Sequence, residues 1–416
     1  MKLSEIPENV ERLAAECERG LAGRFEEIDA VARENTRRVL EAFQEQRVSE
    51  PCFAGTTGYG YDDLGRETLD KVWARVFGAE SALVRVNFVN GTHAIASALF
   101  AALKPGDTLL SVMGAPYDTL RTAIGISGSA HGSLREYGVG YAQVETLSGG
   151  PDLEAIARAA REIRPAAALV QRSRGYDSRR ALTVPEIGEI IRVIKSASPE
   201  TAVVVDNCYG EFLETSEPKA DLLVGSFIKN PGGGLADTGG YIAGSAACVE
   251  LAACRLTSPG IGGEMGATLD QTKKMLRGLF YAPHTVLQAL KTAAFAAYVL
   301  ERLGFEVSPG PFARRLDLVQ SIHFRSERKL VAFCRGIQAG SPVDAFAVPE
   351  PWDMPGYQHK VIMAAGTFTQ GASIELSADA PIREPYTLYL QGGLTFESGV
   401  WGVLHGVEQL LAETGC

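Results

Sequence analysis

The sequence predicts an α/β fold class, with a mainly parallel seven-stranded sheet in a large domain and a smaller C-terminal α/β domain. Three observations support this prediction. Apolar runs without polar alternation recur between residues 81 and 243, which is typical of strands buried on both faces of a parallel sheet. Segments with helical periodicity separate these runs, as in consecutive strand–helix–strand units. The chain has 416 residues, which is too long for one small core.

The first predicted element is a helical arm. Apolar side chains recur at helical intervals from Val10 to Val48, which indicates an amphipathic helix, and the glycines near residue 20 are expected to divide it. We therefore predict an N-terminal arm over residues 1–50, a large domain over 51–280 and a small domain over 281–416. Such an arm packs on a neighbouring subunit or forms a plain surface helix, and the sequence leaves both open.

Strands and helices alternate through the predicted large domain. The predicted strands are 81–86, 108–112, 142–146, 166–170, 202–205, 221–228 and a returning strand at 238–243. The predicted helices are 92–103, 152–162 and 185–195. Thr183 and Glu186 form a capping-box pattern at the start of the last helix. In the smaller domain we predict helices at 285–303 and 398–413, and strands at 361–365, 373–376 and 387–390.

Composition and charge exclude several classes of function. The net charge of −10 argues against nucleic acid or an anionic membrane as the main partner. No apolar stretch is long enough to span a bilayer, and Glu5 and Glu8 stand where a signal peptide needs apolar residues. The seven cysteines contain no C-x-x-C pair and the six histidines show no ligand spacing. We expect a cytoplasmic protein without disulfides or a metal site.

Two successive strand ends carry a lysine and an acid. Lys229 lies between an apolar run and the glycine-rich segment 230–234, which is a poor position for a solvated charge. Asp206 ends the preceding apolar run. Pyridoxal 5'-phosphate (PLP) needs both groups, because a lysine forms the Schiff base and a carboxylate keeps the pyridinium nitrogen protonated. Together they predict a PLP enzyme.

Further residues lie where a PLP site needs them. Gly91, Thr92 and His93 open a helix directly after a strand, where backbone N–H groups bind phosphate, although a simple turn gives the same pattern. Tyr117 follows the next strand and could stack on the cofactor ring, or could be a half-buried tyrosine at a domain seam. Ser226, on the lysine's own strand, could donate a hydrogen bond to the phosphate.

Two arginines are candidates for binding the substrate. Arg383 lies between two predicted strands of the small domain, and its planar guanidinium matches the carboxylate of an amino acid. A surface pair with Glu384 is the alternative. Arg172 leaves the strand before that of Asp206, at the edge where α/β proteins bind ligands. It could contact substrate or phosphate, or it could be a solvated loop charge.

Six segments resemble those of a known family. They are GYGYDDLGR at 58–66, NFVNGTHA at 87–94, QRSRGY at 171–176, VDNCYGEF at 205–212, GSFIKNPGGG at 225–234 and YLQGGLT at 389–395. On these segments the chain resembles the fold-type-I PLP enzymes of the cystathionine and methionine gamma-lyase group, and most closely the branch named "aluminium resistance" proteins. The resemblance implies a PLP-dependent transferase-like fold, similar to that of aspartate aminotransferase.

The resemblance also implies roles and an assembly. The implied roles are cofactor attachment for Lys229, pairing with the pyridinium nitrogen for Asp206, ring stacking for Tyr117, phosphate binding for Gly91, Thr92 and Ser226, and carboxylate binding for Arg383. Active sites shared between subunits of a homodimer or homotetramer are expected. In better-known lyases a tyrosine–serine–arginine stretch reaches the neighbour's phosphate, whereas this chain has Tyr59-Gly60-Tyr61 and lacks the arginine.

The expected activity is that of a PLP-dependent lyase that cleaves a carbon–sulfur bond of an amino acid, as in cystathionine beta-lyase or methionine gamma-lyase. Lys229 would remove the α-proton, and Tyr59 or Tyr61 could act as acid or base when sulfur leaves. Two alternatives remain open. One is an aminotransferase on the same scaffold, and the other is a PLP-binding sensor or resistance protein without turnover.

Overall fold

The computed structural model describes residues 6–128, 131–175, 179–354 and 359–414. The chain forms two compact units, one of residues 35–280 and the other of the residues up to 34 together with those from 281 onward. The predicted arm consists of α1 (Glu8–Gly20) and α2 (Ala22–Glu45), so the predicted break at the glycines is confirmed. The arm is divided between the two units.

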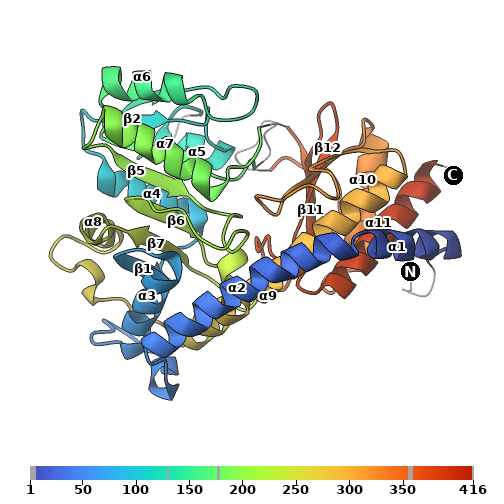
Figure 1. The fold of residues 1–416 in the computed structure, drawn as a ribbon, viewed down its shortest axis with the longest axis horizontal. Coiled ribbons are helices and arrows are strands. Elements are labelled where there is room, and N and C mark those ends of the chain that lie inside the picture. The colour runs from blue at the N-terminus through green and yellow to red at the C-terminus, as the bar shows by residue number, and fades with distance from the viewer. Residues whose placement is uncertain (1–5, 129–130, 176–178, 355–358, 415–416) are drawn as a thin grey trace. The chain divides into compact units, whose positions relative to one another are not determined.

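The unit of residues 35–280 is built on a seven-stranded sheet (Figure 1). Its strands are β1 (Ser81–Arg85), β2 (Thr108–Ser111), β3 (Gly140–Gln143), β4 (Ala167–Gln171), β5 (Ala202–Asp206), β6 (Leu222–Ser226) and β7 (Gly240–Gly244). They lie in the order β1-β7-β6-β5-β4-β2-β3, and β7 runs antiparallel to both of its neighbours while the other pairs are parallel. The predicted mainly parallel sheet with a returning strand is confirmed.

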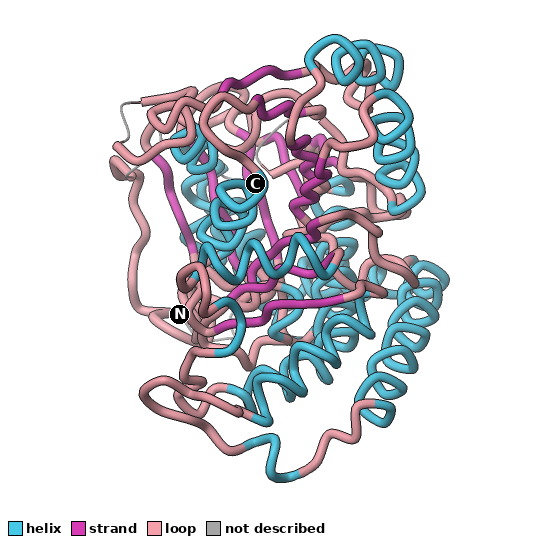
Figure 2. Tube along the Cα trace, turned by 90° about the vertical axis from the view of Figure 1, so that its left-hand side faces the viewer, coloured by secondary structure: helices cyan, strands magenta, loops and turns pink. Residues whose placement is uncertain are grey.

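Helices cover this sheet on its faces (Figures 1 and 2). They are α3 (Leu64–Phe77), α4 (Gly91–Ala102), α5 (Asp118–Ile124), α6 (Leu153–Ile163), α7 (Val184–Ala197) and α8 (Ala246–Leu256). Side chains of α4, α5 and α8 share one apolar cluster with residues of the sheet, and α6 packs on α7. The capping box of Thr183 and Glu186 is present at the start of α7, as predicted.

The other unit holds a five-stranded antiparallel sheet, ordered β10-β11-β12-β9-β8. Its strands are β8 (Glu306–Ser308), β9 (Gln320–His323), β10 (Val361–Ala364), β11 (Ser377–Pro381) and β12 (Thr387–Gln391). The helices are α1, the part of α2 up to residue 34, most of α9 (Thr272–Arg302), α10 (Glu327–Ala339) and α11 (Phe396–Thr414). One apolar core joins these helices to the sheet.

Two predictions in this unit were wrong. The strand predicted at 373–376 is a turn, because the Glu375 carboxylate accepts the backbone N–H groups of Phe368 and Thr369 and folds the segment back. The helix predicted from 285 begins at Thr272, since the chain continues as helix through Pro283, a residue that ends most helices. No helix within the described ranges has the length and apolar character needed to cross a membrane.

Candidate active site

The carboxyl ends of β5 and β6 carry the acid and the lysine singled out in the sequence. Asp206 is the last residue of β5 and is 4% exposed. Lys229 follows the end of β6 and directly precedes a 3-10 turn, η3 (Asn230–Gly232). Because β5 and β6 are parallel neighbours, both side chains leave the same edge of the sheet. Their charges interact across this edge.

Asp206 is a buried acid with a donor and a cation nearby. Its Oδ1 accepts the backbone N–H of Cys208 at 3.1 Å. Burial raises the pKa of the Asp206 carboxyl, while the Lys229 ammonium and the Cys208 N–H group oppose that rise. A further positive partner, such as a protonated ring nitrogen, would stabilise the charged carboxylate.

Lys229 is the cation beside this acid. Its Nζ lies 3.9 Å from the ring centroid of Tyr209, within the range of a cation–π contact. Burial opposes the positive charge, but Tyr209, Cys208 and Asp206 outweigh it and raise the pKa of the amine above its ordinary value. The Lys229 amine therefore carries its proton in this environment.

Tyr209 is a site residue that the sequence reasoning missed. Its φ of 70° lies in the left-handed region, which costs a non-glycine residue about 1–3 kcal/mol and which clusters at functional sites. Phe212 in the same loop has a φ of 65°. No sequence pattern reports φ. The only available signal was that Tyr209 follows the predicted acid within the same short loop.

The start of α4 forms the second part of the site. Gly91 is the first residue of α4, and Asn90 caps the helix by accepting the His93 N–H at 2.8 Å. A Cβ on Gly91 would stand 3.1 Å from Ser226 Cβ and 3.3 Å from Cys208 Sγ. The missing side chain thus lets the helix start lie against the end of β6. The first N–H groups of a helix have no partner within it and attract anions.

The side chain of Ser226 indicates whether a phosphate fits at this helix start. Its side chain is 1% exposed, and its Oγ has no hydrogen-bond partner among the described residues. A buried hydroxyl without a partner costs about 1–3 kcal/mol. An anionic oxygen at the start of α4 would satisfy both this hydroxyl and the helix N–H groups. The residues present therefore fit the phosphate of PLP.

Tyr117 and Thr92 lie beside the helix start. The Tyr117 hydroxyl and Thr92 Oγ1 are 3.1 Å apart in a hydrogen bond, and the Tyr117 N–H donates to Gln171 Oε1 at 3.3 Å. Burial raises the pKa of the Tyr117 phenol, and the negative charge of Asp206 adds to the rise. The phenol therefore stays protonated, and its half-buried ring suits the predicted stacking role.

His93 turns toward the residues before α4. Its Nδ1 accepts the backbone N–H of Val89 at 3.1 Å, and its ring packs edge-to-face on Phe88 with centroids 5.7 Å apart. Burial lowers the pKa of the imidazole, so the neutral form is favoured. These contacts fix the loop that leads into the helix start. The predicted contact of His93 with the cofactor stays a prediction.

The structure corrects the prediction for Arg172. The side chain is fully buried, and its guanidinium donates to Asn207 Oδ1 at 2.8 Å, Glu214 Oε2 at 2.9 Å and Glu217 Oε2 at 3.4 Å. The guanidinium is thus turned toward carboxylates of the loop after β5 and away from solvent. It fixes this loop, which carries Tyr209, and offers no exposed face to a substrate.

The other predicted residues are Tyr59, Tyr61 and Arg383, and all three are exposed. Tyr59 and Tyr61 are 70% and 60% exposed, and their rings contact each other at 5.8 Å. Their loop is anchored by Arg66, which donates to the Gly60 carbonyl and is 2% exposed. Arg383 is exposed in the turn between β11 and β12, in the other unit. The roles of these three residues stay predictions.

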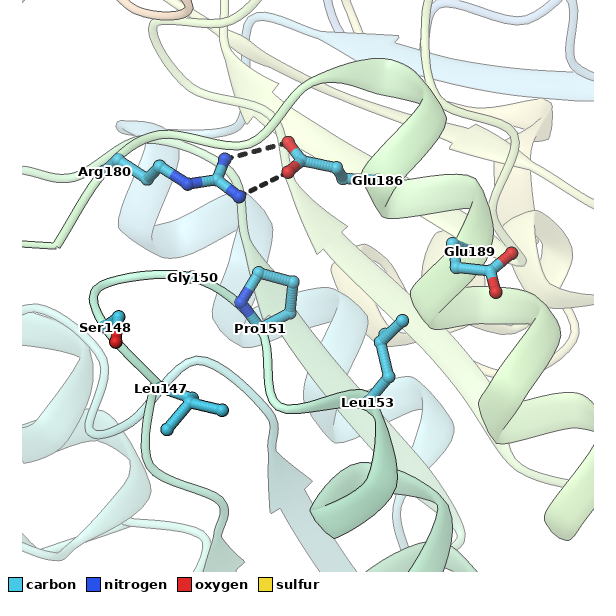
Figure 3. A pocket seen from close by; sticks show the side chains of 8 residues that line it. All are labelled: Leu147, Ser148, Gly150, Pro151, Leu153, Arg180, Glu186 and Glu189. Carbon is cyan, nitrogen blue, oxygen red and sulfur yellow. Dashed lines mark hydrogen bonds and ion pairs between the residues drawn. The ribbon is translucent and has the colours of Figure 1, made fainter.

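A separate pocket of about 320 Å³ lies between the segment 147–153 and the first turns of α7 (Figure 3). Arg180 donates to both carboxylate oxygens of Glu186, so these two charges neutralise each other, and Glu189, which also lines the pocket, pairs with Arg192. The Arg180 guanidinium holds the pKa of Glu186 at about 2. Within the described chain, no group of three or more histidine, cysteine, aspartate or glutamate side chains is placed to hold a metal ion.

Comparison with known proteins adds three findings. Residues 10–411 match the family model described as methionine gamma-lyase. The uncharacterized protein YnbB of Bacillus subtilis (strain 168) is 48% identical over 97% of each chain. A crystal structure described as a carbon-sulfur lyase involved in aluminum resistance, from Clostridium novyi NT, is 49% identical, covers 97% of this chain and 96% of its own, and superposes with a TM-score of 0.93.

A more distant structure identifies the fold. The PLP-dependent protein YhfS from Escherichia coli is 18% identical, covers 92% of this chain and 96% of its own, and superposes with a TM-score of 0.63. This likeness concerns the fold alone. It confirms the predicted PLP-dependent transferase-like architecture, with its large mainly parallel sheet and a second, smaller sheet.

Proposed function

The chain belongs to the methionine gamma-lyase family, and from this premise we propose that it is a PLP-dependent lyase that cleaves a carbon–sulfur bond of an amino acid. One observation carries the proposal. Asp206 and Lys229 leave neighbouring strand ends, next to a buried hydroxyl that has no partner among the described residues and a helix start that begins with glycine. The description of the Clostridium novyi protein as a carbon-sulfur lyase supports the choice of bond.

Each part of the cofactor has a matching group in this chain. Ser226 and the first N–H groups of α4 would hold the phosphate, Asp206 would face the ring nitrogen, and Tyr117 would stack on the ring. Lys229 would bind the aldehyde through Nζ. When bound, the cofactor supplies a ring that accepts the electron pair of the substrate's α-carbon.

The chain's own residues would move the protons. Lys229 Nζ would take the α-proton of the substrate as general base, for which the amine must first lose the proton that its acidic neighbours now favour. Beside a protonated ring nitrogen the Asp206 carboxylate would keep its charge and so would hold the proton on that nitrogen. Tyr209 limits the directions in which the Lys229 amine can swing, because the ring lies against it. We propose that Arg383 binds the substrate carboxylate.

We further propose that a second copy of the chain completes the site. The support is the exposure of Tyr59 and Tyr61, two large aromatic side chains on an anchored loop. In a homodimer or homotetramer one tyrosine could donate a proton to the departing sulfur in the partner's site. Mixing Lys229→Ala subunits with Tyr59→Phe/Tyr61→Phe subunits tests this, because shared sites would restore about a quarter of the activity and separate sites none.

The main test is a screen of sulfur amino acids for release of thiol and keto acid by the purified, PLP-loaded protein, beside Lys229→Ala. We expect thiol release that disappears in the variant. A need for a second keto acid would favour an aminotransferase instead. Bound cofactor without any turnover would favour a sensor. Equal thiol release by Lys229→Ala would refute the assigned base.

A further inference from the structure

One buried acid beside the candidate site forms no ion pair among the described residues. Glu211 lies in the loop after β5 and is fully buried. Its neighbours Glu214 and Glu217 pair with the Arg172 guanidinium, whereas Glu211 takes part in none of the ion pairs between described residues. Its Oε2 is buried without any hydrogen-bond partner in the described chain. A charge left in this position would be strongly disfavoured.

The contacts of Glu211 link the two residues that follow the acid and the lysine of the site. Its Oε1 accepts the Tyr241 hydroxyl at 2.8 Å, and that hydroxyl in turn accepts Asn207 Nδ2 at 3.4 Å. The backbone carbonyl of Glu211 accepts Asn230 Nδ2 at 3.0 Å. Asn207 directly follows Asp206, and Asn230 directly follows Lys229. The pair Glu211–Tyr241 is thus a node between the two functional strand ends.

A glycine makes room for this node. A Cβ on Gly225 would stand 2.6 Å from the Tyr241 hydroxyl and 2.8 Å from Glu211 Oε1, which no real Cβ tolerates. Gly225 lies within β6 and has no positive φ, so its backbone does not require glycine. The space above Gly225 is therefore filled by the Glu211–Tyr241 hydrogen bond itself.

We infer that Glu211 works as an uncharged carboxylic acid and is a positioning residue that sets the spacing between Asp206 and Lys229. The inference rests on the proposed function, because that function gives the spacing its purpose. As a neutral acid, Glu211 accepts from Tyr241 through one oxygen and carries its proton on the other. The buried Oε2 then bears no charge, and the Lys229 amine faces a neutral group on this side.

The electrostatics of the site agree with this assignment. Burial raises the pKa of Glu211 to about 8, while the Tyr241 hydrogen bond and the Lys229 charge oppose the rise. Glu217 adds to it. Cys208 also faces Glu211, and burial holds its thiol protonated by raising its pKa. Glu211 is thus the group whose ionisation is expected near pH 8, and Lys229 feels that change directly.

The test compares Glu211→Gln with Glu211→Ala. Glutamine mimics the protonated acid, because its carbonyl accepts from Tyr241 and its amide donates at the other position. We expect Glu211→Gln to bind PLP within about threefold of the natural protein and Glu211→Ala to bind it at least tenfold more weakly. The pH dependence of the bound cofactor's visible absorbance should lose its step near pH 8 in Glu211→Gln. A step that persists unchanged would overturn the inference.

A second readout needs no cofactor. Infrared spectra of the cofactor-free protein should show a protonated carboxyl band that disappears as the pH passes about 8 and that is absent in Glu211→Gln. Tyr241→Phe should shift this band, since it removes the hydrogen bond to Oε1. If PLP fails to bind but the band is present, the proposed function fails and the protonation state stands. A spectrum in which Glu211 is ionised at pH 6 refutes the inference, whichever variants fold.

Discussion

Replacing Ser226 by alanine should move stability and cofactor affinity in opposite directions. The Ser226 Oγ is buried and has no partner among the described residues, so the hydroxyl destabilises the protein while nothing is bound beside it. An unsatisfied buried hydroxyl costs about 1–3 kcal/mol, and the small loss of packing on its removal offsets part of this. We expect Ser226→Ala to raise the free energy of unfolding of the cofactor-free protein by about 1 kcal/mol.

The same change should weaken PLP binding. A hydrogen bond to a charged oxygen is worth about 1.5–3 kcal/mol, which corresponds to a rise in the PLP dissociation constant of roughly 10- to 150-fold. Denaturant unfolding of the cofactor-free protein measures the first effect, and titration with PLP followed by tryptophan fluorescence measures the second. Both experiments use the full chain and need no substrate.

Ser321→Ala is the matched control. Ser321 is also a buried serine on a strand, at 4% exposure, but its Oγ donates to the Ser308 carbonyl at 2.7 Å and it lies in the other unit. Its replacement should cost about 1 kcal/mol of stability and leave PLP affinity unchanged. The reasoning is refuted if Ser226→Ala destabilises the cofactor-free protein as Ser321→Ala does, or if it leaves PLP affinity within a factor of two.

Three further predictions concern the buried Arg172 and the contacts at the start of α7. Arg172→Met should destabilise the protein by about 3–5 kcal/mol, because it removes the cation that pairs with buried Glu214 and one of the two arginines that pair with buried Glu217; a loss under 1 kcal/mol in denaturant unfolding would contradict the buried network. Thr183→Ala should cost about 1 kcal/mol by removing the capping box of α7, measurable in the same assay. Glu186→Gln should cost up to about 1 kcal/mol at neutral pH, since the pair with Arg180 is partly exposed. The folded-state pKa of Glu186 is lowered to about 2 from 4.5, so this stabilisation is present above pH 4.5 and disappears as the pH falls through 2. A difference between variant and parent that does not change with pH would disprove the pair's contribution.

Sequence reasoning predicted the parts of the site that depend only on residues close together in the chain. Asp206 and Lys229 end apolar runs, so their place at the sheet edge followed from the strands alone. The capping box at the start of α7 was predictable for the same reason, because Thr183 and Glu186 are only three residues apart. Arg172 was misjudged because its partners Glu214 and Glu217 lie more than forty residues further along the chain and form a buried ion cluster only in the folded loop. Without knowledge of these partners, an arginine that follows a strand end is interpreted as a solvent-exposed charge.

Other differences have equally specific causes. The start of α9 was placed after Pro283 because proline disrupts most helices, but a helix can continue through one when its packing is favourable. The backbone angle of Tyr209 leaves no trace in residue types, so a ring that contacts Lys229 could not be inferred. Ser226 Oγ has no hydrogen-bond partner among the described residues, and this is likewise a property of the folded site that the sequence of β6 does not reveal.

The order of strands in the large sheet has a consequence for synthesis on the ribosome. The strand β1 pairs with β7 alone, with Arg85 opposite Gly240, so it emerges long before its partner exists. During that interval the apolar strand has no partner, and an unpaired apolar edge favours aggregation. Closing β7 between β1 and β6 is also the step that fixes the segment holding Lys229. The end of β6, which leads into Lys229, is therefore held on both sides only after β7 has been made.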